Sequence, residues 1–394
     1  MHYKETIPFF NRVASHGIPI RDPKEVKEWA RKELISAFTD FSSKYPNTVS
    51  GLDRPEILYD KSTWERLLMS NEVVIALNGK VLARLWEKNN LPKPVPYFTF
   101  SPEEYSRLSD YDGCVGFAGD LFSLYKKRQR YSGLCGAWLN SYRDGRLWYG
   151  SLHPFGCSTG RCAPCASEGF LPAMGRDVTK ALLCPPNGRC ITILDYKAQG
   201  LCIMSALSGD PNMRALARAK DPYLGLGMLL GLITKDDYDS LTVQELKTRF
   251  SGEREKCKKL MLAYQYGAQE KALGATFGNV SGRELKKTLD KLFASYLYWK
   301  RGINVETQMP DGFISRAKNA TVAHVQGMDA YILRYIITHI SLPDDVNIIA
   351  TNNDCLWVEH PVGYDTSSIA TFMESVANEL CGVKKLFRVD IETI

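Results

Sequence analysis

The sequence contains no long apolar run. No stretch of its 394 residues approaches the roughly 20 consecutive apolar residues of a membrane-spanning helix, so we expect no membrane partner. The first residues, Met-His-Tyr-Lys-Glu-Thr-Ile-Pro, lack the apolar core of a secretory signal. Internal repeats and low-complexity linkers are absent as well. These absences favour a globular chain in a cytosol-like compartment.

Neither charge of one sign nor disulfide chemistry dominates the composition. The 50 basic and 44 acidic residues leave a net charge of +6, which suits phosphate-bearing partners but is shared by many unrelated enzymes. Cysteine occurs 11 times, an odd number, and without a secretory segment we expect these thiols to be reduced. With 44% hydrophobic and 24% charged residues, the chain has the composition of a globular enzyme with two or three packed subdomains.

Most of the chain has a helical pattern. Asp22-Pro23 is a typical helix start, and apolar residues follow it at helical spacing. A second helix is predicted from Asn78 to Asn90, so residues 1–130 are expected to be mostly helical. The segment 135–190 is rich in Gly, Pro and Cys, which is typical of loops and short strands, and residues 212–325 are again helical in pattern.

Two aspartates end or interrupt apolar β-runs. The run from Ile191 ends at Asp195 and is followed by a helical pattern. The runs 346–351 and 355–358 predict a hairpin with Asp354 at or beside its turn, and an amphipathic helix is predicted for Ser367–Leu380.

A carboxylate in such a position is costly unless it is paired or metal-bound. If both strands lie in one sheet, Asp195 and Asp354 can share two hard cations about 3.5–4 Å apart, the arrangement used in two-metal phosphoryl transfer. Mg²⁺ is the cation that carboxylate, water and phosphate ligands favour. The alternative is that each aspartate only caps a helix or forms a turn, which is the more common role of a single aspartate.

A third pattern lies between them. Steps of four residues place Arg254, Lys258, Leu262 and Tyr266 along one stripe of a helix. Two cations at the start of the stripe suit a triphosphate, and an aromatic ring at its end suits a base or sugar. An ordinary solvated helix face is the alternative interpretation.

Taken together, these segments resemble the polymerase domain of family-A polymerases, the DNA polymerase I-like enzymes. The segment from Asp195 to Asp210 resembles their first catalytic motif, and the segment from Arg254 to Gly267 resembles their fingers-helix motif. Asn353-Asp354-Cys355 stands where the DNA polymerases have His-Asp-Glu. Other elements match in order and separation: Thr159-Gly160-Arg161, Asp221-Pro-Tyr223, Gln326-Gly327 and a thumb-like start from Ile7 to Ile20. The resemblance covers nearly the whole chain, and its motifs are specific jointly rather than singly.

The resemblance implies a right-hand α+β fold with a thumb, a palm built on an antiparallel sheet, and helical fingers. The implied division is a thumb-like region with the N-terminal palm edge (1–130), a first palm part with the first catalytic motif (131–212), the fingers (213–325) and a second palm part with the second catalytic motif (326–394). No proofreading exonuclease domain is expected, because the thumb-like segment begins almost at Met1. The implied partners are a primer–template, most simply of DNA, and dNTPs, bound by a monomeric enzyme in the cytoplasm of a bacterial or virus-infected cell.

The resemblance also implies roles for individual residues. The metal site would consist of Asp195, Asp354 and the carbonyl of Tyr196, which would hold two Mg²⁺ ions, with both aspartates catalytic. The nucleotide site would consist of Arg254, Lys258, Leu262, Tyr266, Gly200 and Tyr223, with the first two gripping the triphosphate. The nucleic-acid contacts would come from Arg161, Gln326 and Asn353, the first two in the minor groove.

Several departures from the family bear on the substrate. DNA polymerases of this family carry a Glu that helps to block a ribose 2′-hydroxyl at the position of Gly200, whereas phage-type single-subunit RNA polymerases have Gly there. The RNA polymerases also have a small residue at the position of Cys355. Asn353 replaces the usual His, and Leu262 replaces the usual aromatic residue. Because the thumb-like start resembles the DNA enzymes, a DNA-directed DNA polymerase is favoured, and an RNA-capable or primase-like polymerase that uses rNTPs is the alternative.

Two further interpretations stay open. Cys157, Cys162, Cys165 and Cys184 could supply four thiolates to a structural Zn²⁺ ion, but their spacing fits a zinc module only in part, and small buried thiols in a loop are favoured. A polymerase relic that binds nucleic acid without copying it is suggested by Cys355 and Gly200. The joint retention of the aspartates and the helix stripe argues against it.

Overall fold

The structure is a computed structural model that describes residues 3–44, 75–76, 80–81, 127, 131, 134, 139–150, 152–164, 171–270, 273–274 and 281–394. The chain divides into two compact units. The first unit comprises Met1–Ile20 and Arg146–Ile394, and the second comprises Arg21–Gly145. All candidate site residues named from the sequence lie in the first unit.

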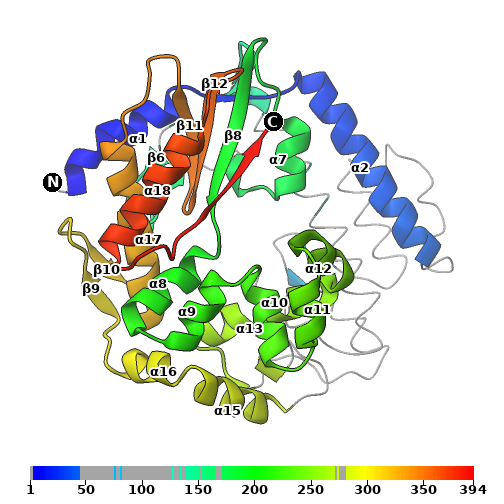
Figure 1. The fold of residues 1–394 in the computed structure, drawn as a ribbon. Helices are drawn as coiled ribbons and strands as arrows, with labels where there is room; N and C mark the ends of the chain where they lie inside the picture. Colours follow the sequence, from blue (N-terminus) through cyan, green and yellow to red (C-terminus); the bar gives the residue numbers. More distant parts are fainter. Residues whose placement is uncertain are drawn as a thin grey trace. The chain divides into compact units, whose positions relative to one another are not determined.

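A four-stranded antiparallel sheet lies at the centre of the first unit, with the strand order β11-β12-β8-β13 (Figure 1). Its strands are β8 (Arg189–Tyr196), β11 (Asn347–Asn352), β12 (Cys355–Pro361) and β13 (Val389–Thr393). The inner strands β8 and β12 are almost continuously buried, since both of their faces are covered. Their apolar residues make this sheet a rigid support for the polar residues at its ends.

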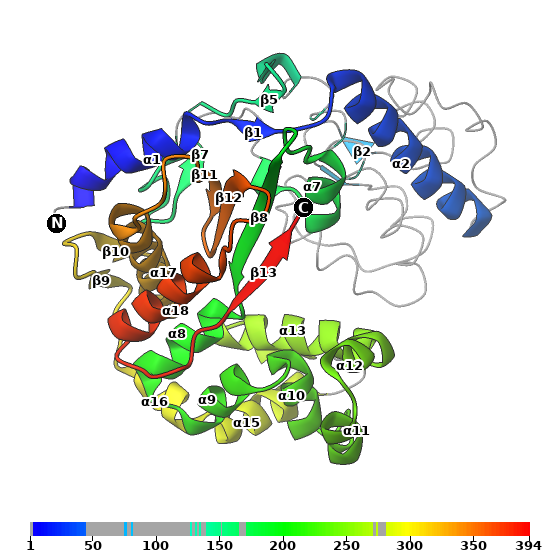
Figure 2. The same cartoon turned by 45° about the horizontal axis from the view of Figure 1, so that its top comes forward.

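Helices cover the sheet. α18 (Ser367–Leu380) packs against α17 (Ala320–His339) and against β13, as Figures 1 and 2 show from two directions. α1 (Ile7–Ala14) packs against β11 and against β6 (Leu152–His153). The buried stripe of α18 recurs at helical spacing, which is why its bounds can be recognised in the sequence.

A group of helices follows β8. It comprises α8 (Gln199–Ser208), α9 (Pro211–Arg218), α10 (Pro222–Leu229), α11 (Lys235–Ser240), α12 (Val243–Arg249), α13 (Ser251–Gln265), α15 (Gly282–Leu292) and α16 (Ala294–Arg301). Two Asp-Pro pairs start helices here: the carboxylates of Asp210 and Asp221 each accept hydrogen bonds from two backbone N–H groups of the next turn. Proline at the first helical position loses no hydrogen bond, so both helix starts are well defined.

The remaining elements are mostly short. They are η1 (Tyr3–Thr6), β1 (Ile18–Pro19), α2 (Pro23–Lys44), β2 (Ile75–Ala76), β3 (Lys80–Val81), η4 (Leu139–Ser141), β4 (Tyr142–Arg143), β5 (Arg146–Leu147), β7 (Ala163–Pro164), η5 (Leu171–Ala173), α7 (Arg176–Leu182), β9 (Glu306–Gln308) and β10 (Ile314–Arg316). In the first unit β1 pairs with β5, β6 with β7, and β9 with β10. No helix within the described ranges is long and apolar enough to cross a membrane.

Most of the elements predicted from the sequence are confirmed. α2 begins directly after Asp22, β8 ends one residue after Asp195, and β11 and β12 form the predicted hairpin around Asp354. The predicted helix Asn78–Asn90 is wrong where it can be compared, because Lys80–Val81 is strand β3, paired with β2; the rest of that range lies outside the described residues. A short apolar pattern fits either structure. The sequence also gave no indication of α7 or of the β9–β10 hairpin.

The end of the sheet far from the aspartates contains a buried ion pair. Glu359 of β12 is 2% exposed, and its carboxylate accepts hydrogen bonds from Arg146 at 2.7 and 2.9 Å and from Arg189 at 2.6 Å. Burial raises the pKa of Glu359, but the hydrogen bonds and charges of the two arginines outweigh it, so the pKa lies below its usual value of 4.5. Glu359 thereby ties β12 to β8 and β5.

We expect Glu359→Gln to lower the free energy of unfolding at pH 7 by up to roughly 3–5 kcal/mol, because two buried arginine contacts lose their counter-charge. Since the folded-state pKa is lowered, this stabilisation is present above the unfolded-state pKa and is lost as the pH falls through the folded value. Chemical denaturation at pH 7 and near pH 3 measures the difference. Glu306→Gln, which removes an exposed pair with Arg316, is the control and should cost under about 1 kcal/mol. If both variants lost the same free energy of unfolding at pH 7, the stabilising role of Glu359 between its two arginines would be contradicted.

Candidate active site

The backbone of the sheet holds Asp195 and Asp354 beside each other. Asp195, on β8, pairs in register with Cys355, the first residue of β12, and Asp354 is the turn residue just before it. The N–H of Tyr196 donates to the carbonyl oxygen of Asp354 at 3.1 Å. The turn is tight because Asn353 adopts a left-handed φ of 57° and the Asp354 N–H donates to Asn352. The sequence prediction that both aspartates share one sheet is therefore confirmed.

Both carboxylates resist ionisation. Burial, followed by the charge of Asp354, raises the pKa of Asp195 to about 7, and burial also raises the pKa of Asp354. The positive charges of Arg176 and Lys258 lower the pKa of Asp195 but do not compensate fully. A site that brings two carboxylates together at such an electrostatic cost is suited to a cation. The donor set is oxygen, which hard cations such as Mg²⁺ prefer.

Asp195 and Asp354 form a pair of neighbouring acidic residues. In the described parts of the chain, no group of three or more His, Cys, Asp or Glu side chains is placed to hold a metal ion. Asp390 of β13 pairs in register with Asp195 on its other side, but its carboxylate is bound to Lys197 at 2.8 Å. The two aspartates would thus leave other coordination positions to water, backbone oxygen or substrate, as is usual for Mg²⁺.

Arg176 is a neighbour of the site that the sequence did not reveal. Its Nη2 lies 2.8 Å from Oδ2 of Asp195, and its Nε lies 3.5 Å from Glu392 of β13. Lys180, one turn later on α7, also pairs with Glu392. The arginine lies in a segment without periodic pattern, and only the tertiary packing of α7 brings it to β8.

Helix α13 supplies the residues of the predicted basic stripe. Arg254 donates from Nε to Asp221 at 2.7 Å and lies 5.4 Å from the centre of the Tyr223 ring. Lys258 has no hydrogen bond or ion pair within the described residues, and its charge acts on Asp195. Leu262 is 39% exposed. The stripe therefore has one tethered cation, one untethered cation near the aspartates, and an apolar side chain open to solvent.

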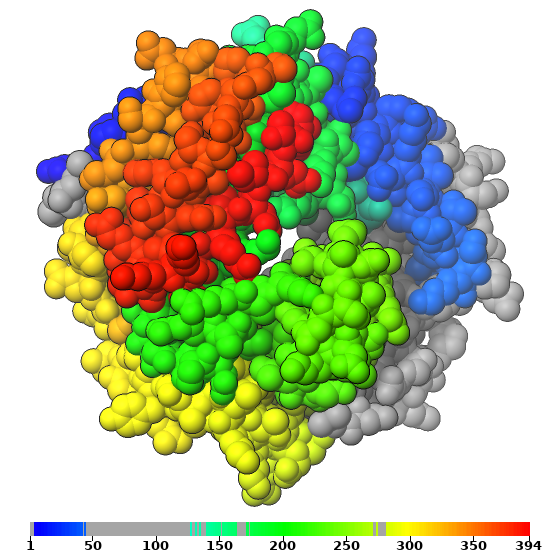
Figure 3. Space-filling model, viewed as in Figure 1, coloured from blue at the N-terminus to red at the C-terminus, as the bar shows by residue number. Residues whose placement is uncertain are grey.

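Tyr266, which directly follows α13, lies beside Gly200 of α8. A Cβ atom at Gly200 would lie 3.7 Å from the Tyr266 hydroxyl oxygen, an ordinary van der Waals distance. Burial raises the pKa of Tyr266, and the charges of Arg161 and Asp354 also act on it. The tyrosine, Gly200, Arg161 and the second aspartate thus face one region. In Figure 3 the molecular surface is hollowed between the red C-terminal strand and the green helices.

The Thr159-Gly160-Arg161 segment is bound to α17. The hydroxyl of Thr159 donates to Gln326 at 3.2 Å, and Arg161 donates from Nε to Asp329 at 2.7 Å. The sequence singled out Arg161 and Gln326 but not Asp329. The only indication of Asp329 in the sequence is that it lies three residues after Gln326, which places both on the same side of the helix.

No protein-family model matches the chain, and no match to a curated protein was found. Among solved structures, the chain is similar to the POL domain of Pol1 from M. smegmatis in complex with a DNA primer-template and dNTP. The TM-score is 0.67 and the sequence identity is 14%, over 99% of this chain and 69% of that one. The chain has the fold of that polymerase domain. At this identity the likeness concerns the fold alone.

Three of the four cysteines of the candidate zinc set lie in the part of the chain that the structure describes, and none of the three forms a disulfide. The favoured interpretation as buried thiols is wrong for Cys157 and Cys184, which are exposed, while Cys162 is partly buried. Cys165 lies outside the described residues. The zinc interpretation therefore stays an untested alternative.

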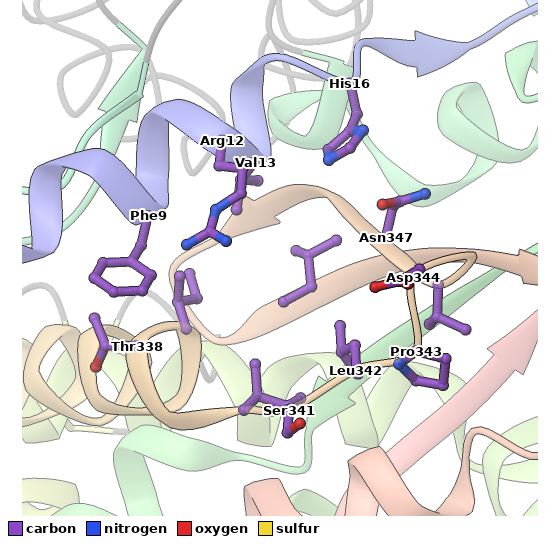
Figure 4. Close-up of a pocket in the computed structure, with 14 residues that line it drawn as sticks. Phe9, Arg12, Val13, His16, Thr338, Ser341, Leu342, Pro343, Asp344 and Asn347 are labelled. Atoms are coloured by element: carbon purple, nitrogen blue, oxygen red, sulfur yellow. The ribbon is translucent and has the colours of Figure 1, made fainter.

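A cavity of about 490 Å³ lies elsewhere in the first unit, between α1 and the segment that joins α17 to β11 (Figure 4). Phe9 and Arg12 line it from α1, His16 lines it from the turn after α1, and Leu342 and Asp344 line it from the connecting segment. None of the residues singled out from the sequence belongs to it. The candidate site therefore lies apart from this cavity, at the end of β8 and β12 where the two aspartates are placed.

The raised pKa of Asp195 has a consequence for stability. Because its folded-state pKa of about 7 exceeds the usual 3.8, the metal-free protein should lose stability as the pH rises through 7. Asp195→Asn cannot ionise, so we expect its melting temperature without divalent ions to exceed that of the wild type at pH 8, with the difference shrinking at pH 5. Thermal melts in chelator at both pH values measure this. Asp390→Asn is the control. If it raised the melting temperature as much as Asp195→Asn does, the destabilisation would not come from the ionisation of Asp195 in particular.

Proposed function

We propose that the chain is a template-directed nucleotidyltransferase of family A that extends a primer by phosphoryl transfer, with DNA as the first choice of template and product. The observation that carries the proposal is the pair Asp195–Asp354, held side by side by strand register and with pKa values that burial raises, in a chain with a polymerase-domain fold. Lys258, Tyr266 and Arg161 around this pair fit the same interpretation. The solved structure of similar fold contains DNA primer-template and dNTP, which supports these partners.

In this proposal the central sheet is the palm and the helices of residues 213–325 are the fingers. Residues 131–212 and 326–394 supply the palm, and residues 1–130 supply the thumb and the palm edge. The sheet carries the catalytic aspartates, and α13 and Tyr266 present the nucleotide-binding residues to them. The division follows the resemblance in sequence, and the compact first unit contains all residues assigned to catalysis.

Asp195, Asp354 and the carbonyl oxygen of Tyr196 would hold the Mg²⁺ ions. When bound, the ions would activate the primer 3′-hydroxyl and stabilise charge on the transferred phosphoryl group. The chain's own residues perform the positioning: Lys258 binds the triphosphate, and Tyr266 lies under the base or sugar. Arg254, with its Nε on Asp221 and its guanidinium over Tyr223, retains other N–H groups for phosphate oxygens.

The direct test is primer extension. We expect Asp195→Ala and Asp354→Ala to abolish Mg²⁺-dependent extension while primer–template affinity and folding are retained, because each carboxylate is required for phosphoryl transfer but not for duplex binding. Gel-based extension and fluorescence anisotropy measure the two properties. Cys355→Ala, at the adjacent position, should be far milder, because a buried thiol is not a ligand of choice for a hard cation. Substantial turnover in either aspartate variant would falsify the assignment.

One observation favours a second candidate function, the use of ribonucleotides. Gly200 faces the Tyr266 hydroxyl, and the space beside it would accept a Cβ without a close contact. Tight packing therefore does not explain the glycine, although glycine within a helix costs roughly 0.5–1 kcal/mol relative to alanine. Without a side chain at this position, a ribose 2′-hydroxyl would meet neither steric hindrance nor a carboxylate. An RNA-capable or primase-like polymerase is thus the second proposal.

We expect the wild type to incorporate rNTPs readily and Gly200→Glu to lower kcat/KM for rNTPs much more than for dNTPs, because the added carboxylate occupies the 2′ side of the sugar. Gly200→Ala is the matched control: its methyl group fits, so the rNTP-to-dNTP ratio should hardly change while the melting temperature rises slightly. Matched nucleotide pairs on one primer–template give the ratios, and a lane without primer tests chain initiation. Rejection of rNTPs by several thousandfold in the wild type would sink the second candidate and leave the first intact.

A further inference from the structure

Helix α17 holds three consecutive residues of the 159–161 segment by three different groups. Gln326 binds the side chain of Thr159, Arg334 donates from Nη1 to the carbonyl oxygen of Gly160 at 3.0 Å, and Asp329 binds the side chain of Arg161. Side chains and backbone of the segment are thus fixed by one rigid element. Such multiple attachment is more than a loop needs to stay folded, and it points to a requirement for precision in the position of Arg161.

The backbone of Gly160 is closely packed and has no room to move. Gly160 has a φ of +78°, and a Cβ atom there would lie 2.7 Å from the Phe313 ring and 3.0 Å from Arg334. Arg334 is itself 2% exposed, with its guanidinium 5.1 and 5.3 Å from the centres of the Phe155 and Phe313 rings and its Nε bound to Asp311 at 2.7 Å. The turn before Arg161 therefore cannot shift without disturbing a packed core.

The attachment at Arg161 is asymmetric. Nε and Nη2 of Arg161 both approach a single oxygen of Asp329, Oδ2, at 2.7 and 2.5 Å. The other oxygen, Oδ1, is buried and has no hydrogen-bond partner among the described residues. Asp329 as a whole is 1% exposed, so its charge is kept out of water at a cost that one arginine offsets only in part. A plain structural ion pair would satisfy both oxygens.

The geometry decides which edge of Arg161 is available. The guanidinium has five N–H groups in a planar fork, and Asp329 occupies the edge formed by Nε and Nη2. The side chain is 26% exposed, and its charge acts on Tyr266 and Asp354. The Nη1 edge is therefore the one left to bind a group close to the aspartates.

We propose that Asp329 is a positioning residue that fixes the Nη1 edge of Arg161 toward the primer terminus, so that extension depends on the shape of the terminal base pair. The inference rests on the proposed polymerase function. Minor-groove acceptors occupy nearly equivalent places in all correct base pairs. A guanidinium that cannot move contacts them in a correct pair and misses them in a mismatched one. A guanidinium released from Asp329 would adjust to both.

The test compares wild type, Asp329→Asn, Arg161→Ala and the double variant on primers with matched and mismatched 3′ termini. We expect Asp329→Asn to lower kcat on the matched primer by roughly tenfold, with little change in nucleotide KM or in primer–template affinity, because only the placement of Arg161 is lost. The matched-to-mismatched ratio of kcat/KM should fall toward that of Arg161→Ala. The double variant should be no worse than Arg161→Ala alone.

Arg161→Lys covers the case in which Asp329→Asn does not fold, since position 161 is partly exposed. A lysine ammonium lacks the planar fork, so it cannot hold Asp329 along one edge and present a fixed second edge to the primer, and this variant should lose discrimination as Asp329→Asn does. Thr338→Val, which removes a hydroxyl of α17 that bonds only to residues near the end of the same helix, is the control and should keep the ratio. The positioning role of Asp329 would be overturned if the losses of kcat in the two single variants multiplied in the double variant. It would also be overturned if Arg161→Lys kept the matched-to-mismatched ratio of kcat/KM. In both cases primer extension by the wild type would still support the proposed polymerase function. If the wild type extended no primer at all, both the proposed polymerase function and the positioning role of Asp329 would be wrong.

Discussion

The register between β8 and β12 is the constraint on which the site depends. It brings the backbones of Asp195 and Asp354 together through the pairing of Asp195 with Cys355 and the hydrogen bond from the Tyr196 N–H to the Asp354 carbonyl oxygen. The same strand pair carries another buried carboxylate, Glu359, at its opposite end. Two arginines bind Glu359 and lower its pKa, whereas Asp195 has one half-exposed arginine and an acidic neighbour and its pKa is raised. At one end of this strand pair the buried carboxylate is thus neutralised by arginines, whereas at the other end two carboxylates keep raised pKa values.

Local patterns in the sequence predicted much of this arrangement. β-runs bounded by Asp195 and Asp354 predicted the hairpin and the shared sheet, and Asp-Pro pairs and apolar periodicity marked α2 and α18. These features depend on residues within one or two turns of each other, so the sequence reports them directly. The helix predicted from Asn78 was wrong because its short apolar pattern also fits a strand, and β3 lies near its start.

The partners of the site residues could not be predicted from the sequence. Arg176 reaches Asp195 only because α7 packs beside β8, and Asp390 lies opposite Asp195 only because β13 joins the sheet edge in that register. Both relations depend on tertiary structure. Asp329 is an intermediate case, since its helical spacing from Gln326 predicts the side of α17 on which it lies, but its bond to Arg161 requires the fold of the 159–161 segment.

The arginines around the site share one property. Arg161, Arg176 and Arg254 each bind a carboxylate, which is Asp329, Asp195 or Asp221, respectively. Only a modest excess of positive charge is therefore presented to an anionic substrate, in agreement with the net charge of +6. Two of these carboxylates, Asp329 and Asp221, are almost fully buried, so we expect them to keep their arginines when a substrate binds. Under the proposed function, Asp195 is the carboxylate expected to exchange its arginine for a cation. Release of Arg176 on metal binding would then add a positive charge where a triphosphate arrives. Lys258, untethered within the described residues, would contribute the first such charge.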